Sequence, residues 1–301
     1  MVCFTKSRIM KYILWLLVLS NILFAEIMTL SRYDERIHYY KNSAYSMIEG
    51  ANIGGIYISY GDIDYLLEVD ISHTHVDFKQ NYINDFNQND YTALFSRYYP
   101  EFMYKFGVHF IDTDDLNLGN GMVIVGSLST YDKNQYAKVG IDTYWSHYKE
   151  GYTYKGIKDT IDIYQMSPYM SYTNIFSNNF SNNIKSTLTY INSAVYAQED
   201  YISYAIEDTL FFNMFQLKGK AYMGEMKSAV TDGGLTVYNT KDLMKHGYGV
   251  ALGYNLTKEF KINISYDVHT FEIPELYKIN NLEINKDVMN NVGILSFSYS
   301  Y

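Results

Sequence analysis

Residues 293–301 read GILSFSYSY. Large apolar side chains occupy every second position of this stretch: Leu295, Phe297, Tyr299 and Tyr301. The positions between them hold Ile294 and three serines. Because successive side chains of a β-strand point to opposite faces, the stretch predicts a strand with one apolar, aromatic face and one small, mostly hydroxylic face.

The same alternation recurs along the chain from residue 53 onward. It is clearest in 102–110, where one parity holds Phe102, Tyr104, Phe106, Val108 and Phe110. It is also regular in 136–146 and 260–270. A soluble β-sandwich contains strands of this period, but a face made so largely of large aromatic side chains is unusual there and favours contact with lipid.

The composition argues against several other classes of protein. The chain holds 34 Tyr and 16 Phe but only 3 Pro, and its formal net charge is -9. That negative charge argues against a nucleic-acid partner. No segment after residue 25 approaches 18 continuous apolar residues, so membrane-spanning helices are not expected.

The first 25 residues predict a secretory signal peptide. They carry Lys6, Arg8 and Lys11 without any acidic residue, and an apolar run leads from Tyr12 to Ala25. The run is short for a helical span, which needs about 20 residues. Cleavage would remove Cys3, the only cysteine, and would change the net charge from -9 to about -12 because three basic residues are lost.

Aromatic residues flank four short turns, in the pairs Tyr60/Tyr65, Tyr99/Phe102, Tyr131/Tyr136 and Tyr254/Phe260. Aromatic rings with a polar edge settle at the headgroup level of a bilayer, and short turns lie on the periplasmic side of membrane barrels. The four turns therefore predict one rim of an aromatic girdle, with Tyr301 at the same level.

Together these features resemble the bacterial outer-membrane β-barrels, a porin-like superfamily. The stretch containing Leu295, Phe297, Tyr299 and Tyr301 resembles the closing strand and assembly signal of such barrels. The resemblance implies an outer-membrane location, contact with outer-membrane lipid, and recognition by the barrel-assembly machinery through the C-terminal strand.

The strand count follows from the side on which the turns lie. If all four aromatic turns share one side, an even number of strands separates each pair, and the readable segments total 14 in one up-and-down barrel over residues 26–301. Residues 26–50 are ambiguous between a first strand, at 37–49, and a plug helix. The alternative is 12 strands with an N-terminal plug segment.

Charged side chains fall on the inward parity of the predicted strands: Glu68, Asp70, Lys105, Lys138, Asp142, Lys185, Lys261 and Asp267. A basic side chain that faces lipid at the midplane costs about 2–4 kcal/mol, so these residues are expected to face water or one another inside the barrel. They are the candidate pore-lining residues.

Two groups of residues suggest other chemistry. His73, His75 and Asp77 alternate on one strand face and form a weak candidate for a metal site such as a zinc site, although the sequence supplies no dedicated further ligand. Their other interpretation is a polar rim above the membrane part of the strand, which ends near Ile71.

A second group has the residue types of a rim hydrolase. Asp112 and Asp114, together with Asp267 and His269, resemble the catalytic residues of the omptin proteases, which are outer-membrane barrels with a water-activating His. The resemblance covers only these short pieces, and Asp112 has the outward parity. No His has Ser two positions later, which argues against outer-membrane phospholipases and lipid A deacylases.

The sequence thus favours a passive pore for small polar solutes, without a cofactor and without enzyme activity. The alternatives are an omptin-like enzyme and a closed structural or adhesive barrel. Strands as numerous as 14 enclose an interior wide enough for water unless a loop or the N-terminal segment fills it. The solute and the oligomeric state, monomer or trimer, stay open.

Overall fold

The computed structural model describes residues 37–42, 48–78, 85–114, 118–132, 134, 136–152, 158–193, 199–238, 243–272 and 287–299. The predicted signal peptide lies outside these residues, as do Ser300 and Tyr301. Among the residues described, no helix is long and apolar enough to cross a bilayer.

Fourteen strands form one antiparallel sheet, as predicted. They are β1 (Ile37–Asn42), β2 (Ile48–Gly61), β3 (Tyr65–Phe78), β4 (Phe86–Tyr98), β5 (Phe102–Thr113), β6 (Gly121–Tyr131), β7 (Ala137–Tyr152), β8 (Lys158–Ser177), β9 (Phe180–Ser193), β10 (Glu199–Phe212), β11 (Phe215–Met226), β14 (Leu243–Asn255), β15 (Phe260–Glu272) and β16 (Asp287–Tyr299). A small second sheet pairs β12 (Val230–Thr231) with β13 (Thr236–Val237), and the 3-10 helix η1 (Asp232–Gly234) lies between them.

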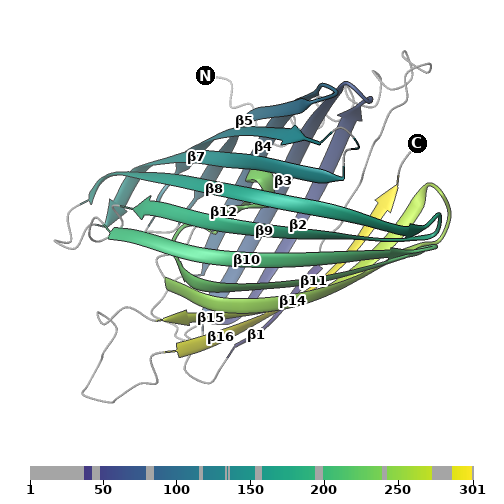
Figure 1. The fold of residues 1–301 in the computed structure, drawn as a ribbon. Coiled ribbons are helices and arrows are strands. Elements are labelled where there is room, and N and C mark those ends of the chain that lie inside the picture. The colour runs from purple at the N-terminus through teal and green to yellow at the C-terminus, as the bar shows by residue number, and fades with distance from the viewer. Residues whose placement is uncertain are drawn as a thin grey trace, which may run out of the picture.

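The large sheet curves round until its first and last strands meet (Figure 1). Nearly every strand pairs with the next large-sheet strand along the chain, and β1 pairs with β16, with Ile37 opposite Leu295. β1 also contacts β2, the strand at the other end of the order. This up-and-down arrangement is a barrel, in which the strand edges find partners that lipid cannot provide.

The two faces of the sheet differ as the alternation predicts. Each large-sheet strand from β3 to β16 exposes large apolar side chains on its outward parity; examples are Phe106, Leu128, Val139, Met170, Ile202 and Ile264. The inward parity holds buried polar side chains; examples are Glu68, Thr92, Ser146, Gln165 and Ser203. Apolar surface of this extent would be unfavourable in water, and it matches the lipid-facing band of a membrane barrel.

The aromatic girdle is more extensive than the sequence indicated. The ring centroids of Tyr99 and Phe102 lie 4.5 Å apart at one short turn. Phe176 and Phe180 lie 4.8 Å apart at a second, which the sequence did not reveal. Phe180 also approaches Phe212 at the next turn along this rim, with 6.1 Å between the centroids.

Several predicted boundaries were wrong. The polar composition of residues 173–182 predicts a connection between strands at 159–172 and 183–196. The segment instead belongs to β8 and β9, apart from a tight turn between Ser177 and Phe180, because its polar side chains pair across the two strands. The sequence also predicts separate strands at 200–206 and 209–223, but the break between them lies inside β10. In the sequence, residues 26–50 are ambiguous between a first strand and a plug helix. Within them, 37–42 form β1 and 48–50 begin β2, which supports the strand interpretation for these residues.

Candidate functional site in the barrel lumen

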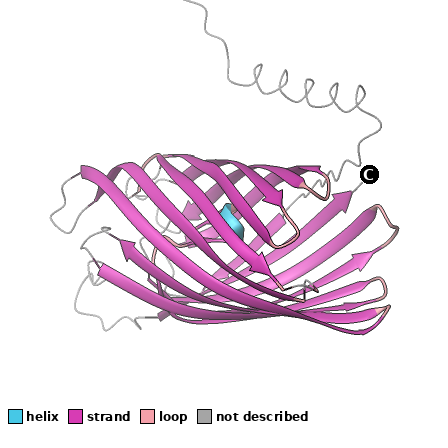
Figure 2. Ribbon diagram, turned by 45° about the horizontal axis from the view of Figure 1, so that its top comes forward, coloured by secondary structure: helices cyan, strands magenta, loops and turns pink. Residues whose placement is uncertain are grey.

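Residues 227–238 form a loop that folds into the barrel; we call this segment the inner loop. Figure 2 shows its short helix, η1, within the ring of strands. The side chain of Gln165 on β8 holds the loop at Val230: its Nε2 donates to the carbonyl oxygen at 2.7 Å, and its Oε1 accepts from the backbone N–H at 2.8 Å. One wall side chain therefore satisfies both backbone groups of a buried loop residue.

Apolar contacts fix the inner loop against one side of the lumen. Val230, Leu235 and Val237 pack on an inward-facing cluster of Leu94, Val123, Val125 and Tyr144. Gly234 has φ +102°, and a Cβ atom at this position would lie only 2.7 Å from a methyl carbon of Val125. A glycine is therefore required both by the backbone conformation and by the close approach.

A second apolar cluster lies beside the first, near the long-loop end of the barrel. It joins Ala229 and Met226 to inward-facing residues that include Ile111, Tyr148, Ile161, Ile163, Ile191 and Tyr201, together with Leu118 from the connection between β5 and β6. The inner loop and the first cluster fill the lumen next to β4, β6 and β7, and the second cluster reaches Ile191 on β9 and Tyr201 on β10. The lumen is thus narrower than 14 strands alone would leave it.

The wall formed by β3, β4 and β5 carries a buried polar network. Lys105 Nζ lies 3.2 Å from Glu68 Oε2, and Tyr57 donates to Glu68 Oε1 at 2.7 Å. On the same wall, His109 Nε2 lies 3.0 Å from Asp90 Oδ1. The ion pairs and the Tyr57 hydrogen bond offset the burial of these charges, while Glu68 Oε2 has the Lys105 ion pair but no hydrogen bond among the residues that the structure describes.

A cavity lies on the other side of the inner loop, against β7–β11, β14 and β15. Its empty volume is about 860 Å³, part of it open solvent. Its charged lining residues are Asp142, Lys185, Glu207, Lys220 and Asp232, and Tyr144, Tyr222, Tyr238 and His269 also line it. Asp232 comes from the inner loop itself, so the loop adds an acidic group to a lining in which the strands supply two lysines and two acidic residues.

Lysines of neighbouring strands form ion pairs along this wall. Glu207 on β10 pairs with Lys218 on β11 and lies 4.0 Å from Lys185 on β9. Lys220 Nζ lies 2.9 Å from Asp267 Oδ1 on β15. The wall therefore offers several partly exposed cations, each held in place by an acidic neighbour.

The structure places all eight candidate pore-lining residues on the inner parity, but in different surroundings. Asp142 and Lys185 line the cavity. Lys138 lies over the rings of Tyr131 and Tyr169, at 5.5 and 5.4 Å from their centroids. Glu68 and Asp70 are buried in the wall. Lys105 pairs with Glu68, Asp267 pairs with Lys220, and Lys261 lies on the inward parity of β15.

The residues with hydrolase-like chemistry are not brought together. Asp267 and His269 face the lumen from β15, where His269 Nδ1 lies 2.9 Å from Tyr222 Oη. Asp112 has the outward parity of β5, a strand separated from β15 by β16, β1, β2, β3 and β4 in the sheet order. A shared catalytic centre would need Asp112 to face the lumen, as Asp267 and His269 do, and its parity on β5 excludes this.

Asp114 follows the end of β5 and belongs to a polar rim. It accepts hydrogen bonds from the backbone N–H and the side-chain amide of Asn87, at 2.6 and 3.2 Å. His73, His75 and Asp77 lie on the outward parity of β3 at the same rim, beyond Ile71. The hydrogen bond with Asn87 and then the one with Asp77 raise the pKa of His75, against the opposing effect of desolvation.

Comparison with known proteins agrees with this architecture. No protein-family model and no curated protein sequence matches the chain. Among solved structures, the CymD monoaromatic hydrocarbon channel has a TM-score of 0.54 at 8% identity, with 94% of this chain and 92% of that chain covered. A bacterial polysaccharide outer membrane secretin has a TM-score of 0.53 at 7% identity, with 92% and 100% covered.

A third similar structure is the Pseudomonas putida toluene transporter TodX, with a TM-score of 0.51 at 8% identity and 90% of each chain covered. The fold is that of the bacterial outer-membrane β-barrels. This confirms the predicted fold class and agrees with the outer-membrane location expected from the sequence.

Proposed function

We propose that this outer-membrane barrel is a passive channel for small polar solutes, and that solutes pass along the wall of β9–β11 beside the inner loop. The observation that carries the proposal is the cavity between Asp232 on the loop and the lysines of the wall. Charged groups on both sides of a narrow aqueous path select solutes by charge and size.

The lining chemistry also bears on the class of solute. The similar structures include a hydrocarbon channel and a toluene transporter. The cavity of this chain is lined by charged, hydroxyl and tyrosine side chains together with the apolar side chains of Ala205, Ala221, Met226, Val230 and Met244. The charged and hydroxyl groups of this lining can replace part of the hydration of a polar solute, which an uncharged hydrocarbon does not need.

Reconstitution in planar lipid bilayers tests the channel. Stable single-channel steps are expected, and Asp142→Asn should change the ratio of cation to anion permeability because Asp142 faces the cavity. A correctly folded barrel that never conducts would overturn the proposal and would favour a closed structural barrel.

Cysteine modification tests the path of the solute. Cys3, which lies in the predicted signal peptide, is the only cysteine of the chain, so one introduced thiol gives a specific label. A charged thiol reagent should reduce the current through Thr187→Cys, since Thr187 lines the cavity. The control is Ser96→Cys, whose position is fully buried in the β4 wall. Equal block at both positions would contradict the proposed path.

A further inference from the structure

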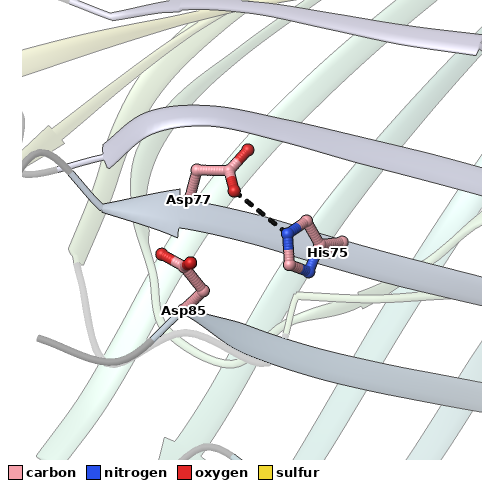
Figure 3. Close-up of side chains that lie close together, drawn as sticks. All are labelled: His75, Asp77 and Asp85. Carbon is pink, nitrogen blue, oxygen red and sulfur yellow. Dashed lines mark hydrogen bonds and ion pairs between the residues drawn. The ribbon is translucent and has the colours of Figure 1, made fainter.

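The outer rim brings three potential metal ligands together from two neighbouring strands. His75 and Asp77 lie near the end of β3, and Asp85 directly precedes β4 (Figure 3). One ligand atom of each residue lies within 4.8 Å of the other two. Asp85 is therefore the further ligand that the sequence alone did not supply for the group of His73, His75 and Asp77.

Hydrogen bonds determine which nitrogen of His75 faces the acidic residues. His75 Nδ1 lies 2.8 Å from Asn87 Oδ1. The amide nitrogen of Asn87 donates to Asp114 Oδ2, which fixes the orientation of the amide. An amide oxygen only accepts hydrogen bonds, so Nδ1 carries the hydrogen and the lone pair of neutral imidazole lies on Nε2.

In the neutral imidazole that lone pair faces a carboxylate, and in the protonated imidazole Nε2–H donates to the same oxygen. His75 Nε2 lies 3.0 Å from Asp77 Oδ1. Two acceptors at this separation repel one another unless a proton or a metal cation lies between or beside them. Tetrahedral ligand atoms around one Zn²⁺ ion, with bonds of about 2.0–2.2 Å, lie about 3.3–3.6 Å apart, so the His75–Asp77 pair at 3.0 Å needs to open by only a few tenths of an ångström to hold the ion.

We propose that His75 Nε2, Asp77 and Asp85 bind one Zn²⁺ ion at the outer rim of the barrel. Asp85 is exposed, so a side-chain rotation can bring its carboxylate to the ion. Asn87 supports the site from outside the coordination sphere, in the manner of the carbonyl groups that orient metal-binding histidines. Three protein ligands leave a fourth tetrahedral position for water.

The imidazole ligand distinguishes this site from an acidic surface that attracts calcium or magnesium, because those ions prefer oxygen ligands in larger number. A second His–Asp contact provides an internal comparison. His147 Nδ1 lies 2.9 Å from Asp162 Oδ1, which also accepts from Trp145. In the part of the chain that the structure describes, this pair has no third ligand of the same kind nearby.

Calorimetric titration tests the site. The full barrel, without a histidine tag, is folded in detergent, treated with chelator and titrated with ZnCl₂. One saturable site per chain is expected, and His75→Ala and Asp77→Asn should each weaken it at least about 10-fold. CaCl₂ should show no saturable binding. The matched controls His73→Ala and His147→Ala should leave the affinity unchanged.

Each variant is checked for heat-modifiable migration on gels, so that loss of binding is not loss of fold. Asn87→Ser should weaken binding by about 10-fold without abolishing it, since it removes the orienting acceptor. Absence of saturable Zn²⁺ binding, saturable binding of calcium alone, or the same affinity in wild type and His75→Ala would overturn the proposal.

Discussion

The two sides of the lumen both carry charges, but they use them differently. In the β3–β5 wall, the side chains of Glu68 and Lys105 are 8% and 17% exposed. In the β10–β11 wall, those of Glu207 and Lys218 are 26% and 35% exposed. The first pair lies on the side of the lumen that the inner loop covers, and the second lies on the side with the cavity.

The difference shows that an inward position does not by itself make a residue part of a passage. A buried charge pair stabilises the wall only as long as both partners are present, because each partner has lost its water. A pair that keeps contact with water depends less on its partner and can act on a passing solute. The position of the inner loop decides which role each pair has.

Removing the inner loop should expose the charge pairs on both sides of the lumen to water, and of the changes considered it should have the largest effect, on single-channel conductance. Replacement of residues 227–238 by a short Gly-Ser turn is expected to raise single-channel conductance about threefold or more, because the occupied side of the lumen becomes open to water. The barrel should still fold, since its strands pair without the loop. An unchanged conductance would show that the loop does not limit the path.

Matched charge removals should separate the two walls by stability. Glu68→Gln leaves Lys105 without its acidic partner in a buried position and should lower the free energy of unfolding by about 3 kcal/mol. Glu207→Gln should lower it by about 1 kcal/mol or less, since Lys218 and Lys185 reach water. Urea unfolding from lipid vesicles measures both values. Equal losses would mean that the walls do not differ in burial.

Loosening the loop should have a smaller, local effect. Gln165→Met removes both partners of the Val230 backbone and should favour opening of the inner loop by about 1–2 kcal/mol. Hydrogen exchange at the Val230 amide measures the change, and about 10-fold faster exchange is expected. Gln88→Met is the control, because Gln88 bonds with Asp90 on the β4 wall. Comparable acceleration in the control would assign the effect to the whole barrel.

The smallest expected effect is on ion selectivity. Lys218→Gln removes one exposed cation from the open wall and should shift the cation-to-anion permeability ratio about twofold toward cations. Reversal potentials in a salt gradient measure the ratio. Lys105→Gln removes the same charge from the covered wall and should leave the ratio unchanged. A larger shift with Lys105 would place the ion path on the other side of the loop.

Most of the barrel was predictable from the sequence, since a strand's period of two is a local property. Alternation and aromatic turns were enough to predict 14 strands and the inward parity of residues such as Asp142 and Lys185. The boundaries near residues 177 and 207 were wrong because polar side chains also pair within strands. Polarity in one short segment does not distinguish a strand end from a turn.

The candidate sites were predictable only in part. Asp85 stood in a predicted loop, and nothing local indicated that it approaches His75. Residues 224–245, which contain Asp232-Gly233-Gly234, are predicted as a long loop, but no local pattern indicates that the tripeptide lies in the lumen. For Asp112 and His269 the residue types suggested one catalytic centre, whereas Asp112 has the outward parity and His269 lines the cavity in the lumen.

The sequence by itself determined which side of each strand faces lipid. Lipid excludes unpaired polar groups, and the polarity of each side chain is known from the residue type alone. Only the tertiary structure decided which inward charges are buried and which line a cavity. That choice depends on contacts such as the one between Gln165 and Val230, 65 residues apart, and the folding of a loop onto a distant wall leaves no periodic pattern in the chain.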